Sequence, residues 1–422
     1  MKQFWIRKSP GQAREMEQRA AQLVPENGRE ALRLHQCLPG YEVTPLVDLP
    51  SIAESLGISR LMVKDESSRL GLPAFKVLGA SWAVLRALEE HFGATLAREM
   101  YSVDGIRGWI RSLASTSGIL TLAAATDGNH GRAVAYMARV LGLHAHIFVP
   151  RGTTEARIAA ITGEGAEVSV VNGTYYDAVR RAQGSAGKDT LVIADTEAKA
   201  KAKAKADAEA GPGGSTHLTP KWVVEGYSTI FAEVDDQLER LSADDPDVVV
   251  VQMGVGALAA ATLRHYKGLA ISTGEPVPST GALRRRHTRV VGVEPDTAAC
   301  VLASLQAGKP VVVPGPHDSI MVGLNCDTPS PVAWPSLLAG LDAAIAVDDA
   351  AAIQAVRHLY RSGLVSGETG AAGLAGMEQI VSATENTALR EALGIGEGTS
   401  VLVLSTEGAT DPTSFQQAIQ DG

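Results

Sequence analysis

The chain has 422 residues, of which 45% are hydrophobic and 20% charged, as in globular proteins long enough for two or more domains. Its formal net charge of −9 argues against nucleic acid or an anionic membrane as the main partner. A membrane span is not expected either, because no run of about 18 uncharged apolar residues occurs in the sequence.

The cysteines and the first residues bear on the compartment. Cys37, Cys300 and Cys326 cannot all pair within one chain, and their spacing matches neither a CxxC nor a zinc pattern. Residues 1–8 contain no apolar core of a secretory signal. We therefore expect reduced thiols, no metal site and a cytoplasmic protein.

Short apolar runs alternate along the chain with amphipathic segments, which predicts parallel α/β sheets with helices on both faces. Strands are predicted at residues 61–63, 120–125, 145–149, 166–171, 190–194, 248–252, 289–293, 343–347 and 400–404. Helices are predicted at residues 77–91, 132–141, 154–161, 175–183, 258–266, 298–306, 350–361 and 370–381.

Two segments do not fit this alternation. In residues 197–209 alanine alternates with lysine, so no hydrophobic stripe forms, and a Gly-Pro-Gly-Gly-Ser run follows at 211–215. We interpret 197–217 as a solvated, low-complexity insertion rather than a binding element. Residues 270–286 are rich in Gly, Pro and Ser and contain three consecutive arginines, and they are interpreted as a surface loop.

Three turns carry chemically informative residues. Residues 74–79 read Ala-Phe-Lys-Val-Leu-Gly at a predicted helix start, and residues 125–131 read Ala-Thr-Asp-Gly-Asn-His-Gly after a predicted strand. Residues 253–258 read Met-Gly-Val-Gly-Ala-Leu, again between a strand and a helix. Because ligands of a doubly wound sheet bind beyond the carboxyl ends of its strands, the three turns suggest one small charged cofactor.

Each turn also has a purely structural explanation. Gly254-Val255-Gly256-Ala257 either brings backbone N–H groups to a phosphate or meets only the steric needs of a tight turn. Lys76 is either a nucleophilic amine that forms a Schiff base or a surface lysine with its stem on apolar neighbours. Asp127 either caps the next helix or acts in catalysis. Asn129 can donate to a phenolate oxygen, whereas His130 is interpreted as a core histidine.

Taken together, the turns resemble those of the fold-type II pyridoxal-phosphate enzymes, the tryptophan synthase β and threonine dehydratase group. More narrowly, the chain resembles the diaminopropionate ammonia-lyase family from about residue 40 to residue 415. Seven motifs occur in the family's order, and each alone is unspecific: Lys64-Asp65-Glu66-Ser67 with Leu72-Pro73-Ala74-Phe75-Lys76, Thr126-Asp127-Gly128-Asn129-His130-Gly131, Gly254-Val255-Gly256-Ala257, Val293-Glu294-Pro295-Asp296, Met321-Val322-Gly323-Leu324-Asn325-Cys326, Ser366-Gly367-Glu368-Thr369-Gly370 and Ser405-Thr406-Glu407-Gly408.

The resemblance implies a role for each site residue. Lys76 would hold pyridoxal 5'-phosphate as a Schiff base and transfer the proton at Cα, with Phe75 near the cofactor ring. Backbone N–H groups of Gly254, Val255, Gly256 and Ala257 would bind the phosphate. Asn129 would hydrogen-bond the ring oxygen, and Thr406 would present its hydroxyl to the pyridine nitrogen.

Two acidic residues give the narrower resemblance. Asp127 stands where many dehydratases of this fold have serine, whereas the narrower family has aspartate there and accepts both enantiomers of its substrate. A carboxylate at this position would pair with a substrate ammonium group or take the α-proton from the face opposite Lys76. Asp195 matches a second acidic residue that helps recognise the substrate's amines.

The expected activity is therefore α,β-elimination of ammonia from 2,3-diaminopropionate, in the L and possibly the D form, giving pyruvate and ammonia. Alternatives of the same fold are dehydration of serine, threonine or 3-hydroxyaspartate, and β-replacement. A non-catalytic relative that binds the cofactor is an alternative of another class.

The sequence departs from the family pattern on the substrate side. After Asp195-Thr196 the family continues with an aromatic and acidic stretch, whereas this chain enters the lysine–alanine insertion. Ala409 stands where the family tends to have aspartate. Neither departure affects the residues that the resemblance assigns to the cofactor.

We expect two open, mostly parallel twisted sheets covered by helices, with the cofactor in the cleft between a large and a small domain. The large domain would comprise residues 1–81 and 198–422, and the small domain, residues 82–197, would close over the substrate. From the family alone we expect a homodimer acting on a small amino acid.

Overall fold

The structure, a computed structural model, describes residues 3–7, 29–113, 120–126, 128–196, 218–268 and 287–420. The lysine–alanine insertion and the loop at 270–286 lie outside the described residues. The chain divides into two compact units: a first unit of Met1–Arg29, Val43–Ser68 and Ile230–Gly422, and a second unit of Glu30–Glu42 and Arg69–Thr229. Residues 82–197 fall within the second unit, and their movement as a separate small domain stays a prediction.

The first unit is built on a seven-stranded sheet in the order β1-β10-β9-β8-β11-β3-β2. All neighbouring pairs are parallel except those of the two edge strands, β1 with β10 and β2 with β3. Every residue of β8 is buried, which explains its continuous valine run, because a central parallel strand is covered on both faces. The strands are β1 Phe4–Ile6, β2 Leu46–Asp48, β3 Arg60–Asp65, β8 Val248–Gln252, β9 Arg289–Pro295, β10 Ala343–Val347 and β11 Ser400–Ser405.

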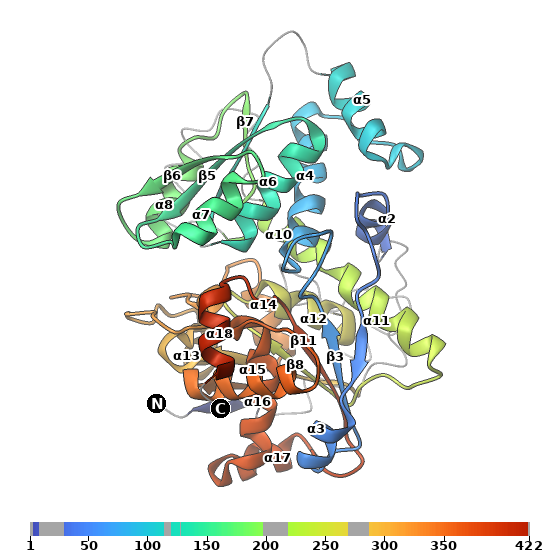
Figure 1. The fold of residues 1–422 in the computed structure, drawn as a ribbon, viewed down its shortest axis with the longest axis vertical. Coiled ribbons are helices and arrows are strands. Elements are labelled where there is room, and N and C mark those ends of the chain that lie inside the picture. The colour runs from blue at the N-terminus through green and yellow to red at the C-terminus, as the bar shows by residue number, and fades with distance from the viewer. Residues whose placement is uncertain are drawn as a thin grey trace. The chain divides into compact units, whose positions relative to one another are not determined.

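Helices cover this sheet (Figure 1). The helix α16 packs across β8, β9, β10 and β11, with α15 beside it, whereas α12 and α13 pack against the strands β8, β9 and β10. The helices are α3 Pro50–Ser55, α11 Ser228–Arg240, α12 Ala257–Lys267, α13 Cys300–Ala307, α14 Trp334–Gly340, α15 Asp349–Arg361, α16 Glu368–Ser382, α17 Thr387–Ala392 and α18 Pro412–Gln420. Three short 3-10 helices are η3 Asp296–Ala298, η4 Val322–Leu324 and η5 Thr384–Asn386.

The second unit contains a four-stranded, wholly parallel sheet in the order β6-β5-β4-β7. The helix α6 packs on β4 and β5, α8 packs on β4, β5 and β6, and α4 lies against both α6 and α10. The strands are β4 Thr121–Ala125, β5 His144–Pro150, β6 Glu167–Val171 and β7 Thr190–Val192. The helices are α2 Glu30–Gln36, α4 Lys76–Phe92, α5 Val103–Leu113, α6 Asn129–Leu141, α7 Glu155–Thr162, α8 Tyr175–Gln183 and α10 Thr219–Gly226, with the 3-10 helix η2 Arg98–Met100.

The predicted fold class of two mostly parallel sheets covered by helices is confirmed. Every predicted strand and helix is present, and β8, β10 and α8 have the predicted bounds. The edge strands β1 and β2 were not predicted, because three residues are too few to show a period of two. Several helices also escaped prediction, among them α10 and α11 after the insertion and the short α14 and α17.

A buried carboxyl group joins β9 to α13. The side chain of Glu294 is fully buried, and its oxygens accept hydrogen bonds from the N–H groups of Val301 and Leu302, each at 2.7 Å. Burial raises the pKa of Glu294 to about 8, although the hydrogen bonds from the backbone of Val301 and Leu302 act in the opposite direction. The carboxyl group therefore retains its proton in the folded chain well above its ordinary pKa of 4.5.

This pKa predicts how stability depends on pH. Between about pH 4.5 and about pH 8 the folded chain holds a proton on Glu294 that the unfolded chain releases, so the free energy of unfolding falls as the pH rises. Glu294→Gln removes this titratable carboxyl group and keeps a side-chain oxygen that accepts a hydrogen bond. The melting temperature of the variant, relative to wild type, is expected to rise by several degrees from about pH 5 to about pH 8. Thermal unfolding of Glu294→Gln and of a control at the exposed residue Glu385, Glu385→Gln, checks this; an identical pH dependence of all three proteins would contradict it.

Candidate active site

Lys76 is the first residue of α4, directly after the N-cap residue Phe75. Its side chain is 23% exposed, and Nζ donates a hydrogen bond to Asp195 Oδ2 at 3.3 Å. Nζ also lies 5.7 Å from the centroid of the Phe75 ring. The structure thus brings together three of the predicted site residues, and it places the lysine in an ion pair instead of free in solvent.

Asp195 follows the carboxyl end of β7, where a parallel sheet places its ligands. The Tyr175 hydroxyl donates to Asp195 Oδ1 at 3.0 Å. Burial by itself raises the pKa of Asp195, but the nearby His130 and Lys76 charges and the Tyr175 hydroxyl outweigh burial and lower it below its ordinary value. Asp195 is therefore a carboxylate at neutral pH, held by a cation on one oxygen and a phenol on the other.

Tyr175 is positioned by the capped start of a helix. Thr174 and Asp177 form a capping box in which the Asp177 carboxylate accepts from the Thr174 N–H at 2.7 Å. This box fixes the first turn of α8, where Tyr175 is the first helical residue. Sequence analysis had identified Tyr175 only as a helix start, because nothing local links it to an aspartate 20 residues away.

The turn after β4 contains the other predicted site residues of the second unit. Asn129 begins α6, and Asp127 lies outside the described residues. His130 is 2% exposed; one ring nitrogen, Nε2, bonds the Ile193 carbonyl at 2.9 Å, and Nδ1 has no partner. His130 is thus buried as expected for a core histidine, yet it also faces the site, since its charge acts on Asp195.

The glycine loop lies in the first unit, between β8 and α12. Gly256 is the N-cap of α12 with φ +92°, and a Cβ on it would lie 2.5 Å from Leu337 Cδ1. A Cβ on Gly254 would lie 3.0 Å from the Gly323 carbonyl oxygen. Gly256 therefore favours glycine by its φ, and a Cβ at either position would need a neighbour to shift. The loop ends on the first turn of a helix, where N–H groups lack partners within the helix.

Thr406 lies beside this loop in the sheet, because it follows β11 and β11 pairs with β8. The Thr406 side chain is 2% exposed, and its Oγ1 accepts a hydrogen bond from Gln252 Nε2 at 3.0 Å. The same amide also donates to the Leu404 carbonyl at 3.0 Å, which fixes its orientation. With its oxygen serving as an acceptor, the Thr406 hydroxyl keeps its proton for a further acceptor.

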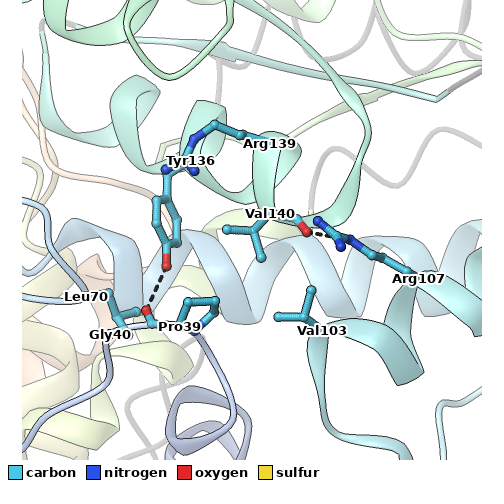
Figure 2. A pocket seen from close by; sticks show the side chains of 8 residues that line it. All are labelled: Pro39, Gly40, Leu70, Val103, Arg107, Tyr136, Arg139 and Val140. Carbon is cyan, nitrogen blue, oxygen red and sulfur yellow. Dashed lines mark hydrogen bonds between the residues drawn. The ribbon is translucent and has the colours of Figure 1, made fainter.

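A separate hollow of about 480 Å³ opens in the second unit (Figure 2). There the Tyr136 hydroxyl donates to the Pro39 carbonyl at 3.0 Å, and Arg107 Nε donates to the Val140 carbonyl at 2.8 Å. None of the predicted site residues lines this hollow. Within the described residues, no group of three His, Cys, Asp or Glu side chains could hold a metal ion. No helix in the same residues is long and apolar enough to cross a membrane.

Comparison with known proteins identifies the class to which this fold and these residues belong. The family model described as "Pyridoxal-phosphate dependent enzyme" matches residues 37–407. The chain belongs to this family and, within it, to the diaminopropionate ammonia-lyases.

Individual relatives support the narrower assignment. The chain is 32% identical over 398 residues to the diaminopropionate ammonia-lyase of Escherichia coli strain K12, covering 93% of this chain and 91% of the relative. A crystal structure of the Escherichia coli enzyme in complex with D-serine gives a TM-score of 0.78 at 28% identity, covering 99% of this chain and 97% of that one. A crystal structure of that enzyme with an aminoacrylate-PLP azomethine reaction intermediate gives 0.77 at 30% identity, covering 100% of this chain and 96% of that one.

The residues of the site fit pyridoxal 5'-phosphate chemically. The loop at Gly254 and Gly256 leaves little room for a side chain, as suits a backbone cradle for a phosphate. The Thr406 hydroxyl is buried and retains a proton to donate. Lys76 offers a primary amine that is paired with the carboxylate of Asp195. These are the three functional groups that a pyridine ring, its phosphate and its aldehyde need.

The glycine loop yields a prediction for cofactor affinity. Gly256→Ala would force a Cβ to within 2.5 Å of Leu337 Cδ1 at a residue with φ +92°. We expect the affinity of the apo-protein for pyridoxal 5'-phosphate to fall about tenfold or more, because displacing the loop moves its N–H groups. Absorbance titration of the apo-protein with the cofactor measures this affinity.

The matched control is Gly308→Ala. Gly308 also has a positive φ, +67°, but nothing lies within 4 Å of its Cβ position. Backbone strain in the left-handed region, about 1–2 kcal/mol, is therefore common to both variants. Equal cofactor affinity of the two variants would show that the contact at Gly256 is irrelevant to the cofactor.

Proposed function

We propose that this protein catalyses the pyridoxal-phosphate-dependent α,β-elimination of ammonia from 2,3-diaminopropionate. Overall, one diaminopropionate and one water give one pyruvate and two ammonia molecules. The observation that carries the proposal is the ion pair of Lys76 with Asp195 at 3.3 Å, on a chain whose relatives are diaminopropionate ammonia-lyases. A carboxylate beside the reactive amine suits a substrate that carries two amino groups.

We assign the binding of the cofactor to the residues that the resemblance implies. Gly254, Val255, Gly256 and Ala257 hold the phosphate through backbone N–H groups, and Thr406 donates its hydroxyl to the pyridine nitrogen. Lys76 binds the aldehyde carbon, with Phe75 near the ring and Asn129 on the ring oxygen. A neutral hydroxyl at the pyridine nitrogen leaves that nitrogen unprotonated, which favours elimination over transamination.

The bound cofactor supplies an electron sink for the pair of electrons left at Cα when its proton departs. Lys76 takes that proton from one face of the substrate, and Asp127 takes it from the opposite face of the other enantiomer. Asp195 binds an ammonium group of the substrate, because it is ionised and each of its oxygens, one accepting from Lys76 and the other from Tyr175, can accept a further hydrogen bond. These three residues together account for the use of both enantiomers.

Assembly and location are proposed on the family alone. We propose a homodimer in the cytoplasm that acts on a small amino acid. The division into a large domain, residues 1–81 and 198–422, and a small mobile domain, residues 82–197, is also proposed, and crystals grown with and without a substrate analogue test whether residues 82–197 move as one body.

The first test is substrate use by the purified protein. We expect visible absorbance from bound cofactor and pyruvate release from L- and D-2,3-diaminopropionate, with much slower release from L- and D-serine. Serine is the appropriate rival because a related crystal structure contains D-serine. Lys76→Ala should lose the absorbance of the covalent adduct and activity on every substrate. A coloured protein active on serine and idle on both diaminopropionate isomers would instead favour a dehydratase, and a colourless, inactive wild type would favour a non-catalytic relative.

The two proton acceptors can be separated by the enantiomers. Asp127→Asn keeps the size of the side chain and removes the base, so kcat on D-diaminopropionate should fall at least about 100-fold more than kcat on the L-isomer. Asp195→Asn is the matched control, because loss of amine recognition should raise KM for both isomers. Equal losses of kcat on the two isomers in Asp127→Asn would refute this division of roles.

A further inference from the structure

The hollow of about 480 Å³ in the second unit contains no residue of the proposed active site. All of the residues that line it belong to this one unit. Figure 2 shows the side chains of Val103 on α5 and Val140 on α6 pointing toward each other, with Arg107 at one end of the hollow and Tyr136 and Pro39 at the other. Its volume lies within the range of small-molecule sites.

One end of the hollow carries an oriented positive charge. Arg107 Nε donates a hydrogen bond to the Val140 carbonyl at 2.8 Å, which ties the guanidinium group to α6. The two Nη atoms of Arg107 donate no hydrogen bond to any of the described residues. The Asp104 carboxylate lies 3.9 Å from Arg107 Nη1, and its side chain is 96% exposed, so water screens this pair. The Nη groups of Arg107 are therefore held in place and can bind an anion.

The second arginine of the hollow, Arg139, already has an anionic partner. Its Nε and Nη2 atoms donate to Glu164 Oε2 at 3.1 and 2.8 Å, and its guanidinium carbon lies 5.3 Å from the centroid of the Tyr136 ring. Among the described residues, no Asp or Glu side chain lines the hollow. An ammonium group there would meet the charge of Arg107 without a carboxylate to offset it, so the hollow selects against amines, including diaminopropionate.

The remainder of the lining is mostly apolar. Val103 precedes Arg107 by one turn of α5, so the two side chains lie on the same face of the helix. Val140 and Leu70 are buried, at 6% and 4% exposure. An inorganic anion at Arg107 would leave this apolar lining in contact with water, whereas the hydrocarbon part of an organic anion would cover it. The arrangement thus matches an amphipathic anion.

We propose that the hollow is a binding site for a small aliphatic carboxylate that carries no amino group. The two carboxylate oxygens accept hydrogen bonds from the two Nη groups of Arg107, because the planar guanidinium group suits bidentate binding of a carboxylate. The aliphatic part of the ligand packs against Val103, Val140 and Leu70. Binding here involves no chemical step and is independent of the proposed reaction.

Calorimetric titration of the holo-protein with 4-methylpentanoate tests this site. We expect saturable binding of one ligand per chain with a Kd below about 1 mM. Arg107→Gln should raise the Kd about tenfold or more, because a charge-assisted hydrogen-bonded pair is lost. The matched control is Arg111→Gln, which removes the same charge from an exposed position of α5 outside the hollow. Its Kd should stay within about twofold of wild type.

Three further ligands separate the contributions of charge and hydrocarbon. The alcohol 4-methylpentan-1-ol keeps the hydrocarbon without the charge, trimethyl(4-methylpentyl)ammonium reverses the charge, and acetate keeps the carboxylate with little hydrocarbon. Each should bind at least about tenfold more weakly than 4-methylpentanoate. None of these ligands contains a primary amine, an aldehyde or a ketone that could condense with the cofactor or with Lys76.

Several results would overturn the inference. Absence of saturable binding by wild type would refute the site, and an equal Kd for wild type and Arg107→Gln would place the ligand elsewhere. Equally tight binding of the alcohol or the quaternary cation would refute the role of the Arg107 charge. If Arg107→Gln does not fold, Val103→Phe fills the hollow from the first residue of α5; its Kd should rise about tenfold, and an unchanged Kd would equally refute the site.

Discussion

The proposed chemistry of this protein depends on one partly buried ion pair, Lys76 with Asp195 at 3.3 Å. A charged amine removed from water is costly unless it is paired, and Asp195 supplies the charge while Tyr175 occupies its other oxygen. The pair joins the start of α4 to the end of β7 in the smaller sheet. The capping box of α8, which fixes Tyr175, helps to hold the pair in place.

In both sheets, the residues proposed for the site follow the carboxyl ends of strands. Gly254 follows β8, Thr406 follows β11, Asn129 follows the turn after β4, and Asp195 follows β7. At the carboxyl end of a parallel strand the chain must leave the sheet, so its side chains and N–H groups become available to a ligand. The buried valine run of β8 and the alanine run of β4 are the apolar supports that make these ends rigid.

Buried polar groups orient the side chains proposed for the site. The Gln252 amide lies within hydrogen-bond distance of the Thr406 hydroxyl and of three backbone carbonyls, and His130 bonds the Ile193 carbonyl close to Asp195 in the chain. Each of these contacts fixes a side chain that a cofactor or substrate would meet. Because these side chains are already held in place, the binding of a cofactor or substrate requires little reorganisation of them.

Sequence by itself determined the alternation of strands and helices and the family, and it led to the proposal of which lysine, aspartates, glycines and threonine belong to the site. It could do so because strand and helix periods are local and because the seven motifs follow one another in a fixed order. The short edge strands β1 and β2 carried no such period. The parts played by Tyr175 and His130 were decided only by the tertiary structure, since each acts on Asp195, which lies 20 or more positions away. Contacts at that separation follow from how helices and strands pack, which no local pattern encodes.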